Sequence, residues 1–463
     1  MTEQLKLKLN DSKATRWGAL VIVAFTMMAA YYVNDVVAPL KTMLDTDLAW
    51  SSTDFGFFTG GYSFLNVFFL MLIWGGLILD RFGIRFTGKL ATILMVGGTA
   101  LEYYAMTGLA GADATLFGIN EIFGYKTGVF VAFAGYSIFG VGAEVAGITG
   151  SKIIAKWFKG KELATAMGVQ VALARIGSQA GYAVAIPLAR AFGISTPVLL
   201  GLVLLLGGMI AFFIFAVMDK KLDKQMEAAA IAAGTEDEEE KFSFKDVKNI
   251  LVNPGFWLIA LLCVLFYSCV FPFQKFASEL MIIKYGINEN VAGTFAGLPA
   301  LGALILTPVF GGFIDKRGKS ASIMLLGSAM LICVHFIYAI PDINYWLVAI
   351  VLMIILGIAF SLVPSAMWPA VAKIFPVSQL GTAYALIFFI QNIGLWGIPT
   401  LIGWVLDAYC ISGKKPDGTN MYDYTVTMCI FTGIACLALI VALLLKKADK
   451  KYGYKLEEPN IQK

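Results

Sequence analysis

The stretch GLILDRFGIR, Gly76–Arg85, closes one long apolar run, and a close copy, GGFIDKRGK at Gly311–Lys319, closes another. In both copies a glycine precedes an aspartate and a basic residue, and a second glycine and another basic residue follow. The glycine allows a tight turn, and the carboxylate is expected to cap a neighbouring helix and pair with a basic side chain. A plain basic loop that only sets orientation is the alternative. Because the turn recurs, we predict a duplicated unit with conformational latches at Asp80, Arg81, Gly83, Arg85, Asp315 and Lys316.

The composition around these turns is that of an integral membrane protein. Of 463 residues, 59% are hydrophobic and only 14% are charged, and the mean hydropathy is +0.78. In soluble proteins, about a quarter of the residues are charged. The apolar runs are about 20 residues long, which favours spanning helices over the roughly 10-residue alternating strands of a membrane barrel. The net charge of +4 is ordinary for basic loops and does not suggest nucleic acid.

The apolar runs predict an all-α membrane protein of twelve transmembrane helices in two pseudo-symmetric six-helix bundles. The N-terminal bundle is expected over 17–218 and the C-terminal bundle over 255–446, with end segments at 1–16 and 447–463 and a linker at 219–254. The linker contains the acidic run Glu236–Glu240 and is expected to be solvated. The predicted helices cover residues 17–38, 54–78, 86–107, 128–152, 162–190, 195–218, 255–281, 291–313, 320–340, 345–372, 380–408 and 425–446.

Lysine and arginine gather in alternate loops and at both ends of the chain, which predicts cytoplasmic termini. The first apolar run has no small-residue cleavage site, so we expect it to remain as the first spanning helix. The six cysteines include no CxxC pair, and no metal cluster, nucleotide loop or hydrolase elbow occurs in a suitable context. We therefore expect no enzyme activity, no metal and no cofactor.

Two opposite charges lie inside apolar runs on either side of a basic turn. They are Glu144 and Arg175, in GVGAEVAGITGSKIIAKWFKGKELATAMGVQVALARIGS, Gly140–Ser178. If both segments are helical, Glu144 lies about 18 Å from Lys156, and Arg175 lies about 20 Å from Glu162. Each charge at that depth costs roughly 2.5–3.5 kcal/mol, which makes a polar ligand site the default hypothesis.

Other polar and aromatic residues fall at the same depth, about 12–14 residues from the predicted cytoplasmic loops. Packing of aromatic rings and hydrogen bonds between helices are the alternatives for any one of them. Asp35 lies about 29 Å from Arg16, near the external mouth, where a hydrated entry or capping role is expected. The remaining predicted substrate-binding residues are Tyr31, Tyr62, Asn66, Ser178, Gln179, Tyr267, Phe271, Ser361 and Gln391.

A structural salt bridge between the two helices is one interpretation of Glu144 and Arg175. The other is a substrate with separate charges, whose carboxylate binds the guanidinium in a two-pronged contact and whose ammonium binds the glutamate. The two interpretations are compatible, because a pair that satisfies itself when empty avoids two unpaired buried charges. The pair indicates a zwitterionic or anionic solute.

The repeated turn, G-x-x-x-D-[RK]-x-G-x-[RK], resembles the signature of the major facilitator superfamily. Further segments are similar to the lysosomal members that act as dipeptide uniporters and to their bacterial relatives. These segments span both halves: YSFLN at Tyr62–Asn66, AEVAG around Glu144, WFKGKELATAMGVQVALARIGS at Trp157–Ser178, FPF at Phe271–Phe273, AMWPAVAKIFP at Ala366–Pro376 and QLGTAYALIFFIQNIGL at Gln379–Leu395.

The resemblance implies two bundles that rock about a midplane site, with Glu144 and Arg175 at the acidic and basic substrate positions. It implies dipeptides as substrates, and we expect an inner gate at Trp368 and Pro369. Lysosomal members carry an N-terminal dileucine sorting signal and work with a glycosylated lumenal partner protein. Here the N-terminus has no dileucine, and the sequon at Asn10 is on the cytoplasmic side. A bacterial inner-membrane protein without an obligatory protein partner is therefore expected.

The sequence favours uniport, because it lacks the ExxER arrangement of proton-coupled peptide transporters and the antiporter glycine-proline motif. Proton-coupled peptide transport stays open, since Glu144 could carry a proton. A porter of small organic or inorganic anions, such as nitrate or carboxylates, is a rival, and a second cavity arginine would favour it. A receptor or scaffold signalling through 219–254 is the rival from another class, and the lack of an appended soluble domain argues against it.

Overall fold

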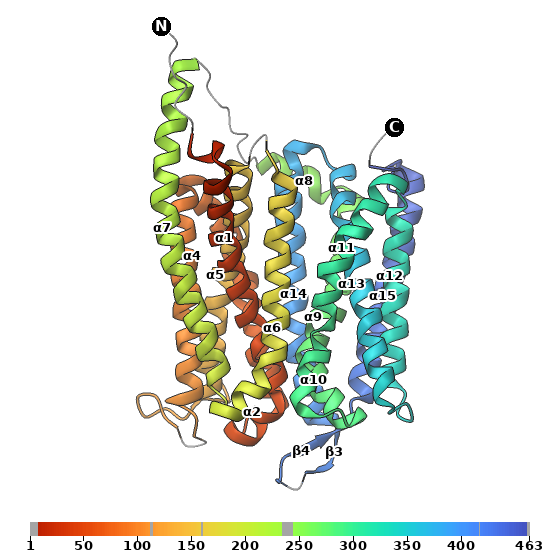
Figure 1. Cartoon of the computed structure of the whole chain (residues 1–463). Helices are drawn as coiled ribbons and strands as arrows, with labels where there is room; N and C mark the ends of the chain where they lie inside the picture. Colours follow the sequence, from red (N-terminus) through yellow and green to blue (C-terminus); the bar gives the residue numbers. More distant parts are fainter. Residues whose placement is uncertain (1–7, 112–113, 159–160, 234–243, 416, 461–463) are drawn as a thin grey trace.

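The computed structural model describes residues 8–111, 114–158, 161–233, 244–415 and 417–460. Long helices stand side by side, with α1 beginning and α15 ending at one end of the molecule and the β3–β4 hairpin at the other (Figure 1). We call these the termini end and the hairpin end. The acidic run Glu236–Glu240 of the predicted linker lies outside the described residues.

The first half of the chain supplies seven α-helices, two short 3-10 helices and one small β-hairpin to the described structure. The strands β1 and β2 are antiparallel, with Glu121 opposite Lys126. The elements are η1 (Leu9–Asp11), α1 (Lys13–Val36), η2 (Ala38–Leu40), α2 (Lys41–Leu48), α3 (Ser52–Phe68), α4 (Met71–Thr107), β1 (Glu121–Ile122), β2 (Tyr125–Lys126), α5 (Thr127–Trp157), α6 (Leu163–Phe192) and α7 (Thr196–Ala233).

The second half repeats this pattern and adds a short helix in front of it. Strands β3 and β4 are also antiparallel, with Ile411 opposite Tyr422. The elements are α8 (Phe244–Leu251), α9 (Pro254–Tyr285), α10 (Glu289–Ala296), α11 (Leu298–Arg317), α12 (Ser320–Ala339), α13 (Trp346–Ile374), α14 (Val377–Tyr409), β3 (Ile411–Lys414), β4 (Asn420–Tyr422) and α15 (Thr425–Tyr452).

The helix α4 consists of two arms joined at Gly83, whose φ of 73° and ψ of 176° are not helical. A left-handed φ of this kind is readily adopted only by glycine. Contacts with α5 show that the chain reverses its direction at Gly83. Before the turn, the contacts move forward along α5, from Phe133 at Gly61 to Val145 at Gly75. After the turn they move back, because Gly98 lies against Phe139. The tight turn predicted at the first latch is confirmed.

Twelve crossings follow when the arms of α4 are counted separately. The first arm continues α3 after a bend at Phe69 and Leu70, and α10 continues into α11. Taken whole, nine helices among the described residues are long and apolar enough to cross a membrane, with the bent pair of α3 and α4 as a tenth candidate. The all-α prediction with two six-helix bundles is confirmed.

Several predicted helix ends differ from the structure by a few residues, and the largest difference is at the end of α7. The helix α7 runs on to Ala233, whereas the apolar run predicted its end near residue 218. The reason is local, because the segment DKKLDKQMEAAAIAA that follows is polar but consists largely of strong helix formers. Apolar content therefore marks where the helix leaves the membrane and not where it ends.

Glycines set the closest helix contacts. The clearest is Gly177 on α6, where an added Cβ would lie 2.1 Å from the carbonyl oxygen of Met28 on α1. On α5, a Cβ at Gly140 would lie 2.1 Å from the carbonyl oxygen of Tyr62. These contacts hold the helices that carry Arg175 and Glu144 against their neighbours.

Gly177→Ala is expected to lower the thermal unfolding midpoint by several degrees, because a backbone carbonyl cannot move aside without separating α1 from α6. The matched control is Gly168→Ala in the same helix, where an added Cβ meets nothing within 4 Å. Alanine is favoured over glycine inside helices by about 1 kcal/mol, so the control should unfold at the same or a higher temperature. Equal midpoints for the two variants would contradict the close contact.

Candidate substrate site between the two halves

Tyr31 on α1 interacts with both predicted charges. The guanidinium carbon of Arg175 lies 5.7 Å from the centre of the Tyr31 ring. Tyr31 also interacts electrostatically with both Arg175 and Glu144. The two charges, on α6 and α5, therefore share one neighbour on a third helix.

Arg175 faces the second half of the molecule. Its guanidinium carbon lies 4.8 Å from the centre of the Phe360 ring on α13. No carboxylate oxygen of the described residues lies within 4.0 Å of it, so this guanidinium is held by aromatic faces alone. Its planar fork of N–H donors is therefore free to bind a carboxylate in two-pronged fashion.

Glu144 is half-buried, and one of its oxygens accepts a hydrogen bond from the Tyr62 hydroxyl at 3.0 Å. No lysine or arginine in the described part of the chain forms an ion pair with it. The direct salt bridge between Glu144 and Arg175, one of the two interpretations of the sequence, is absent from this structure. Each charge is left without a counter-charge, which is the arrangement a zwitterion would complete.

Aromatic rings of the second half form a wall beside Arg175. Tyr267 and Phe271 on α9 stack with ring centres 5.5 Å apart and planes at 9°. Phe271 packs edge-on against Phe360 at 5.3 Å, and the Trp368 ring lies 6.5 Å from Tyr267. These rings exclude water from one side of the guanidinium, which strengthens its interactions.

Three further predicted residues differ in how many of their hydrogen-bonding groups remain available for a substrate. Asn66 is only 1% exposed, and neither atom of its side-chain amide has a partner among the described residues. Gln391 accepts a weak hydrogen bond from the Cys263 thiol at 3.4 Å. The Ser361 hydroxyl donates to the carbonyl oxygen of Gly357 in its own helix, so its proton is already used. Of the three, Asn66 has the greatest unused hydrogen-bonding capacity.

Asp35 does not occupy a hydrated mouth, and that prediction was wrong. It is 7% exposed, and its carboxylate pairs with Lys275 of α9 at 3.1 Å. The Ser178 hydroxyl donates to its other oxygen. Burial is possible here because the ammonium of Lys275 compensates the charge, with further bonds to the Asn34 carbonyl at 2.6 Å and the Tyr136 hydroxyl at 3.4 Å.

Lys275 is the buried charged residue beside the site that the sequence analysis missed. It lies in the apolar run of α9, one turn after Phe271, but about 21 residues, or about 31 Å, beyond Pro254, outside the depth that was tested. The signal was present, since a lysine inside a membrane span is as costly as Glu144 or Arg175. Gln179 also lies at this level and donates to the Thr294 carbonyl of α10 at 3.3 Å.

The two halves are joined by ion pairs at the hairpin end. Besides Asp35 with Lys275, the buried Lys41 pairs with Glu279. Arg190 pairs with Glu289 beside a hollow of about 480 Å³. At the termini end, the described ion pairs all lie within one half. The structure is therefore a form closed at the hairpin end.

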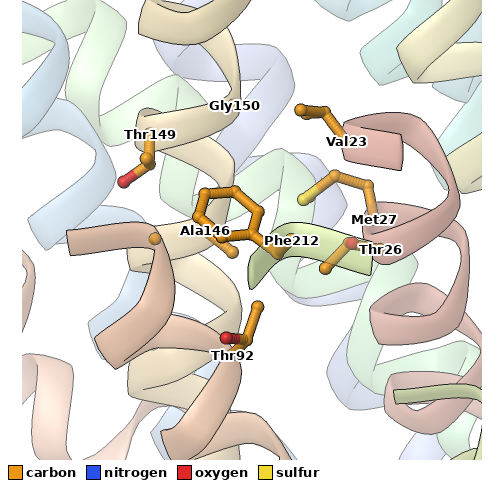
Figure 2. Close-up of a pocket in the computed structure, with 9 residues that line it drawn as sticks. Val23, Thr26, Met27, Thr92, Ala146, Thr149, Gly150 and Phe212 are labelled. Carbon is orange, nitrogen blue, oxygen red and sulfur yellow. The ribbon is translucent and has the colours of Figure 1, made fainter. Parts of the chain in front are cut away.

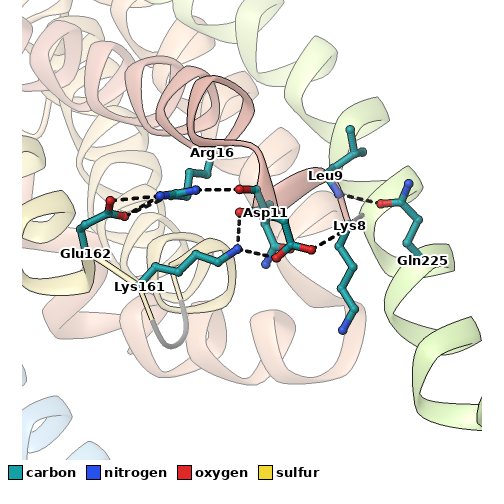
Figure 3. A network of polar contacts seen from close by, with 8 residues as sticks. Lys8, Leu9, Asp11, Arg16, Lys161, Glu162 and Gln225 are labelled. Atoms are coloured by element: carbon teal, nitrogen blue, oxygen red, sulfur yellow. Dashed lines mark hydrogen bonds and ion pairs between the residues drawn. The ribbon is translucent and has the colours of Figure 1, made fainter. Parts of the chain in front are cut away.

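The network at the termini end holds the start of the chain against the first half (Figure 3). Arg16 donates to both oxygens of Glu162 at 2.9 and 3.0 Å, and Lys161 pairs with Asp11 at 2.9 Å. A backbone hydrogen bond and the Arg16 side chain hold the pKa of Glu162 below its usual value. The hydrogen bond from Lys161 likewise lowers the pKa of Asp11. Both carboxylates are therefore ionised at neutral pH.

The first latch turn binds its own half. Asp80 pairs with Lys152 at 3.0 Å, and Arg85 pairs with Asp223 at 2.6 Å. Arg81 lies over the Phe82 ring at 5.5 Å and makes no ion pair with any described carboxylate. The turn thus ties α4 to α5 and α7.

The second latch turn binds the tail of the chain instead. Asp315 accepts a hydrogen bond from the Asn460 side chain at 2.7 Å, while Lys316 is exposed. The carboxylate of Glu457 accepts from the Ser322 amide at 2.8 Å and from its hydroxyl at 2.9 Å, and so caps the start of α12. Leu456 is fully buried beside it.

Near the termini end of α13, Trp368 packs against Phe388 of α14 with ring centres 4.9 Å apart. The carbonyl oxygen of Trp368 accepts a hydrogen bond from Tyr384 at 3.0 Å. Pro369 follows inside the same helix. These contacts join α13 and α14 within the second half.

A separate small cavity lies inside the first half, between α1, α4, α5 and α7 (Figure 2). Its volume of about 10 Å³ leaves space for one water molecule at most. The hydroxyl of Thr149 in its wall donates to the Val145 carbonyl of its own helix at 2.7 Å. This cavity is too small to hold a transported solute.

Comparisons with known proteins agree with the architecture. The human lysosomal dipeptide transporter MFSD1 is 29% identical over 409 residues, covering 85% of this chain and 81% of the relative. The zebrafish protein of the same name, from Danio rerio, is 27% identical over 441 residues, covering 93% and 86%.

Solved structures share the fold at low sequence identity. The nucleoside transporter NupG superposes with a TM-score of 0.68 at 12% identity, covering 92% of this chain and 98% of that one. An inward-facing, occupied bacterial homologue of the human lysosomal transporter Spinster gives 0.67 at 14%, covering 95% and 98%. The family model described as the Major Facilitator Superfamily matches residues 20–399 and 276–459. With its repeated turn, twelve crossings and two joined halves, the chain belongs to the Major Facilitator Superfamily of membrane transporters.

Proposed function

We propose that this protein transports dipeptides by alternating access and works as a uniporter. The observation that carries the proposal is the pair of uncompensated charges around Tyr31, Arg175 from α6 and Glu144 from α5. Arg175 binds the substrate carboxylate, and Glu144, steadied by Tyr62, binds the ammonium. An extended dipeptide is about 7 Å long, which separates its two charges enough to meet two different helices.

The rest of the proposed cage comes from both halves. Asn66 offers an unused amide to the peptide group, and Tyr267, Phe271 and Gln391 form the opposite wall. Closure at the hairpin end, by the pairs of Asp35 with Lys275 and Lys41 with Glu279, represents one of the two states of the cycle. The relatives named as dipeptide transporters support the same substrate class.

The proposed setting is a bacterial inner membrane with both termini in the cytoplasm and no obligatory protein partner. The described ends of the chain lie at the same end of the molecule (Figure 1). The positive-inside rule assigns the ends and loops that are rich in lysine and arginine to the cytoplasm. In this orientation the hairpin end faces outward, and the structure represents an inward-facing state.

A porter of small anions is the competing function. It would gain support from a second free cation near Arg175, and Lys275 is the obvious candidate. Lys275 is instead neutralised by Asp35 at 3.1 Å, so the cage offers one free positive charge beside one free negative charge. That balance favours a zwitterion over nitrate or a dicarboxylate.

Thermal-shift binding on purified protein tests the proposal. Ala-Ala is expected to raise the unfolding midpoint, whereas N-acetyl-Ala-Ala and Ala-Ala-amide, which each lack one charge, should raise it much less. Nitrate and dicarboxylates test the competing function of an anion porter. Free alanine, a shorter zwitterion, tests whether the distance between the two charges matters. Stabilisation by nitrate with no response to any dipeptide would contradict the proposal.

Uniport is tested separately in proteoliposomes. With the pH on the hairpin side held constant, the initial rate of dipeptide uptake is expected not to follow the sign of a pH gradient imposed from the other side. Accumulation of dipeptide above its external concentration when a proton gradient is applied would replace uniport with proton-coupled transport.

A further inference from the structure

A third carboxyl group lies in the membrane-spanning part of the first half, and the proposed transport site does not use it. Glu102, on the second arm of α4, is completely buried. Among the described residues, neither of its carboxyl oxygens has a hydrogen-bond partner, and no lysine or arginine pairs with it. Its helix packs tightly on α5, where a Cβ at Gly135 would lie 2.8 Å from the Glu102 amide nitrogen.

The ionisable groups that face Glu102 belong to the network that joins the two halves. Lys275 of α9 interacts with it electrostatically, and so does Tyr136 of α5. The spanning part of α7, the other helix packed on α4, carries no ionisable side chain between residues 196 and 218. Lys275 is already bound to Asp35 at 3.1 Å, and Tyr136 donates to the Asn34 carbonyl at 2.7 Å.

The charges in this buried cluster do not balance without a proton. Two carboxyl groups, Asp35 and Glu102, share one ammonium, that of Lys275. Asp35 holds the ammonium by direct contact, while no donor of the described part of the chain lies within hydrogen-bond distance of Glu102. An ionised carboxylate without partners in such a place would cost several kcal/mol, so the neutral acid is the stable form.

We propose that Glu102 is a proton-binding site whose occupancy stabilises the form closed at the hairpin end. When the halves separate at that end, Lys275 leaves with α9, and water reaches Asp35 and the space that Lys275 occupied. The Glu102 carboxyl then gives up its proton to this water, and it must take a proton back before the halves close. High pH therefore favours the open form, and low pH favours the closed form.

Glu102 exchanges its proton with the hairpin end only, because in the closed form it is sealed from solvent on all sides. One proton leaves and one returns from the same side in each cycle. The site therefore adjusts the closing equilibrium to the pH of one compartment and moves no net proton across the membrane. It is compatible with uniport, and it goes beyond the proposed function because it involves no dipeptide.

The test measures opening of the hairpin end in the absence of substrate. Nitroxide labels at Asn120→Cys in the first half and Lys414→Cys in the second, in a background with the six native cysteines replaced, report the distance between the halves by double electron–electron resonance. Both positions are exposed at the hairpin end. Between pH 5 and pH 8 the ratio of open to closed molecules is expected to rise at least about tenfold.

Glu102→Gln keeps the shape of the neutral acid and cannot ionise, so its open-to-closed ratio should stay at the low-pH value throughout. The matched control is Asp342→Asn, an exposed carboxylate at the same end of the second half, which should respond to pH like the parent. A parent that does not respond to pH, or a Glu102→Gln variant that responds like the parent, overturns the proposal. It is also overturned if Asp35→Asn abolishes the response while Glu102→Gln preserves it.

Discussion

Arg175→Ala is expected to weaken dipeptide binding by about 100-fold or more and to reduce uptake to background. The guanidinium supplies two charge-assisted hydrogen bonds to one carboxylate, each worth about 1.5–3 kcal/mol in a site sheltered from water. Lys275, the other buried cation described on the side of the second half, is already engaged by Asp35 and is not available for this role. Calorimetric titration with Ala-Ala measures the loss directly.

The same variant shows which end of the dipeptide Arg175 binds. In the parent, Ala-Ala should bind much more tightly than Ala-Ala-amide, whereas in Arg175→Ala the two should bind equally weakly. Arg175→Lys keeps the charge but loses the planar fork, so binding should recover only in part. Arg317→Ala, at an exposed arginine of the second half, should bind like the parent. A persisting preference for the free carboxylate in Arg175→Ala would place that carboxylate elsewhere.

Lys275→Met is expected to cause the largest loss of stability in the set. Removing the ammonium leaves Asp35 buried and unpaired, and breaking a buried ion pair from one side costs about 3–5 kcal/mol. The two residues are joined across the halves at 3.1 Å, so the loss falls on the form closed at the hairpin end. The unfolding midpoint should drop, and the labelled halves should populate the open form.

The double variant Asp35→Asn, Lys275→Met separates the lost pair from lost packing. Because both charges are gone, it should recover most of the stability that Lys275→Met loses, as a double-mutant cycle would record. Lys284→Met in the same helix is the matched control, since the described hydrogen bonds of Lys284 go to the carbonyls of Tyr338 and Ile340 and not to a carboxylate. If the double variant is no more stable than Lys275→Met, the pair is not the source of the effect.

The sequence predicted the parts of the fold that depend on local chemistry. The turn at Gly83 needs a left-handed glycine, and each apolar run must satisfy its own backbone as a helix, so the crossings could be counted directly. Depth counting also selected Glu144 and Arg175, which the structure places around Tyr31. The selection of these two residues uses only the rise per residue of a helix and the free-energy cost of placing a charge inside the membrane.

The inter-half network could not be found in this way. Asp35 and Lys275 are 240 positions apart in the chain, and their pairing depends on how two bundles tilt against each other. The depth test excluded both because it assumed that function lies only at the midplane. Glu102 was not singled out, although a carboxyl group inside an apolar run is as costly as Glu144, and its burial without partners among the described residues reveals it.

The segment that caps α12 makes the first turn of this helix depend on residues that are synthesised much later. The cap on Ser322 comes from Glu457, 135 positions further along the chain. While the chain is being made, α12 enters the bilayer before its cap exists, and its first turn stays uncapped until Glu457 has been synthesised. A stop codon before Glu457, or a bulky tag fused closely behind Asn460, would leave that turn open in the finished molecule, so purification tags belong at the other terminus.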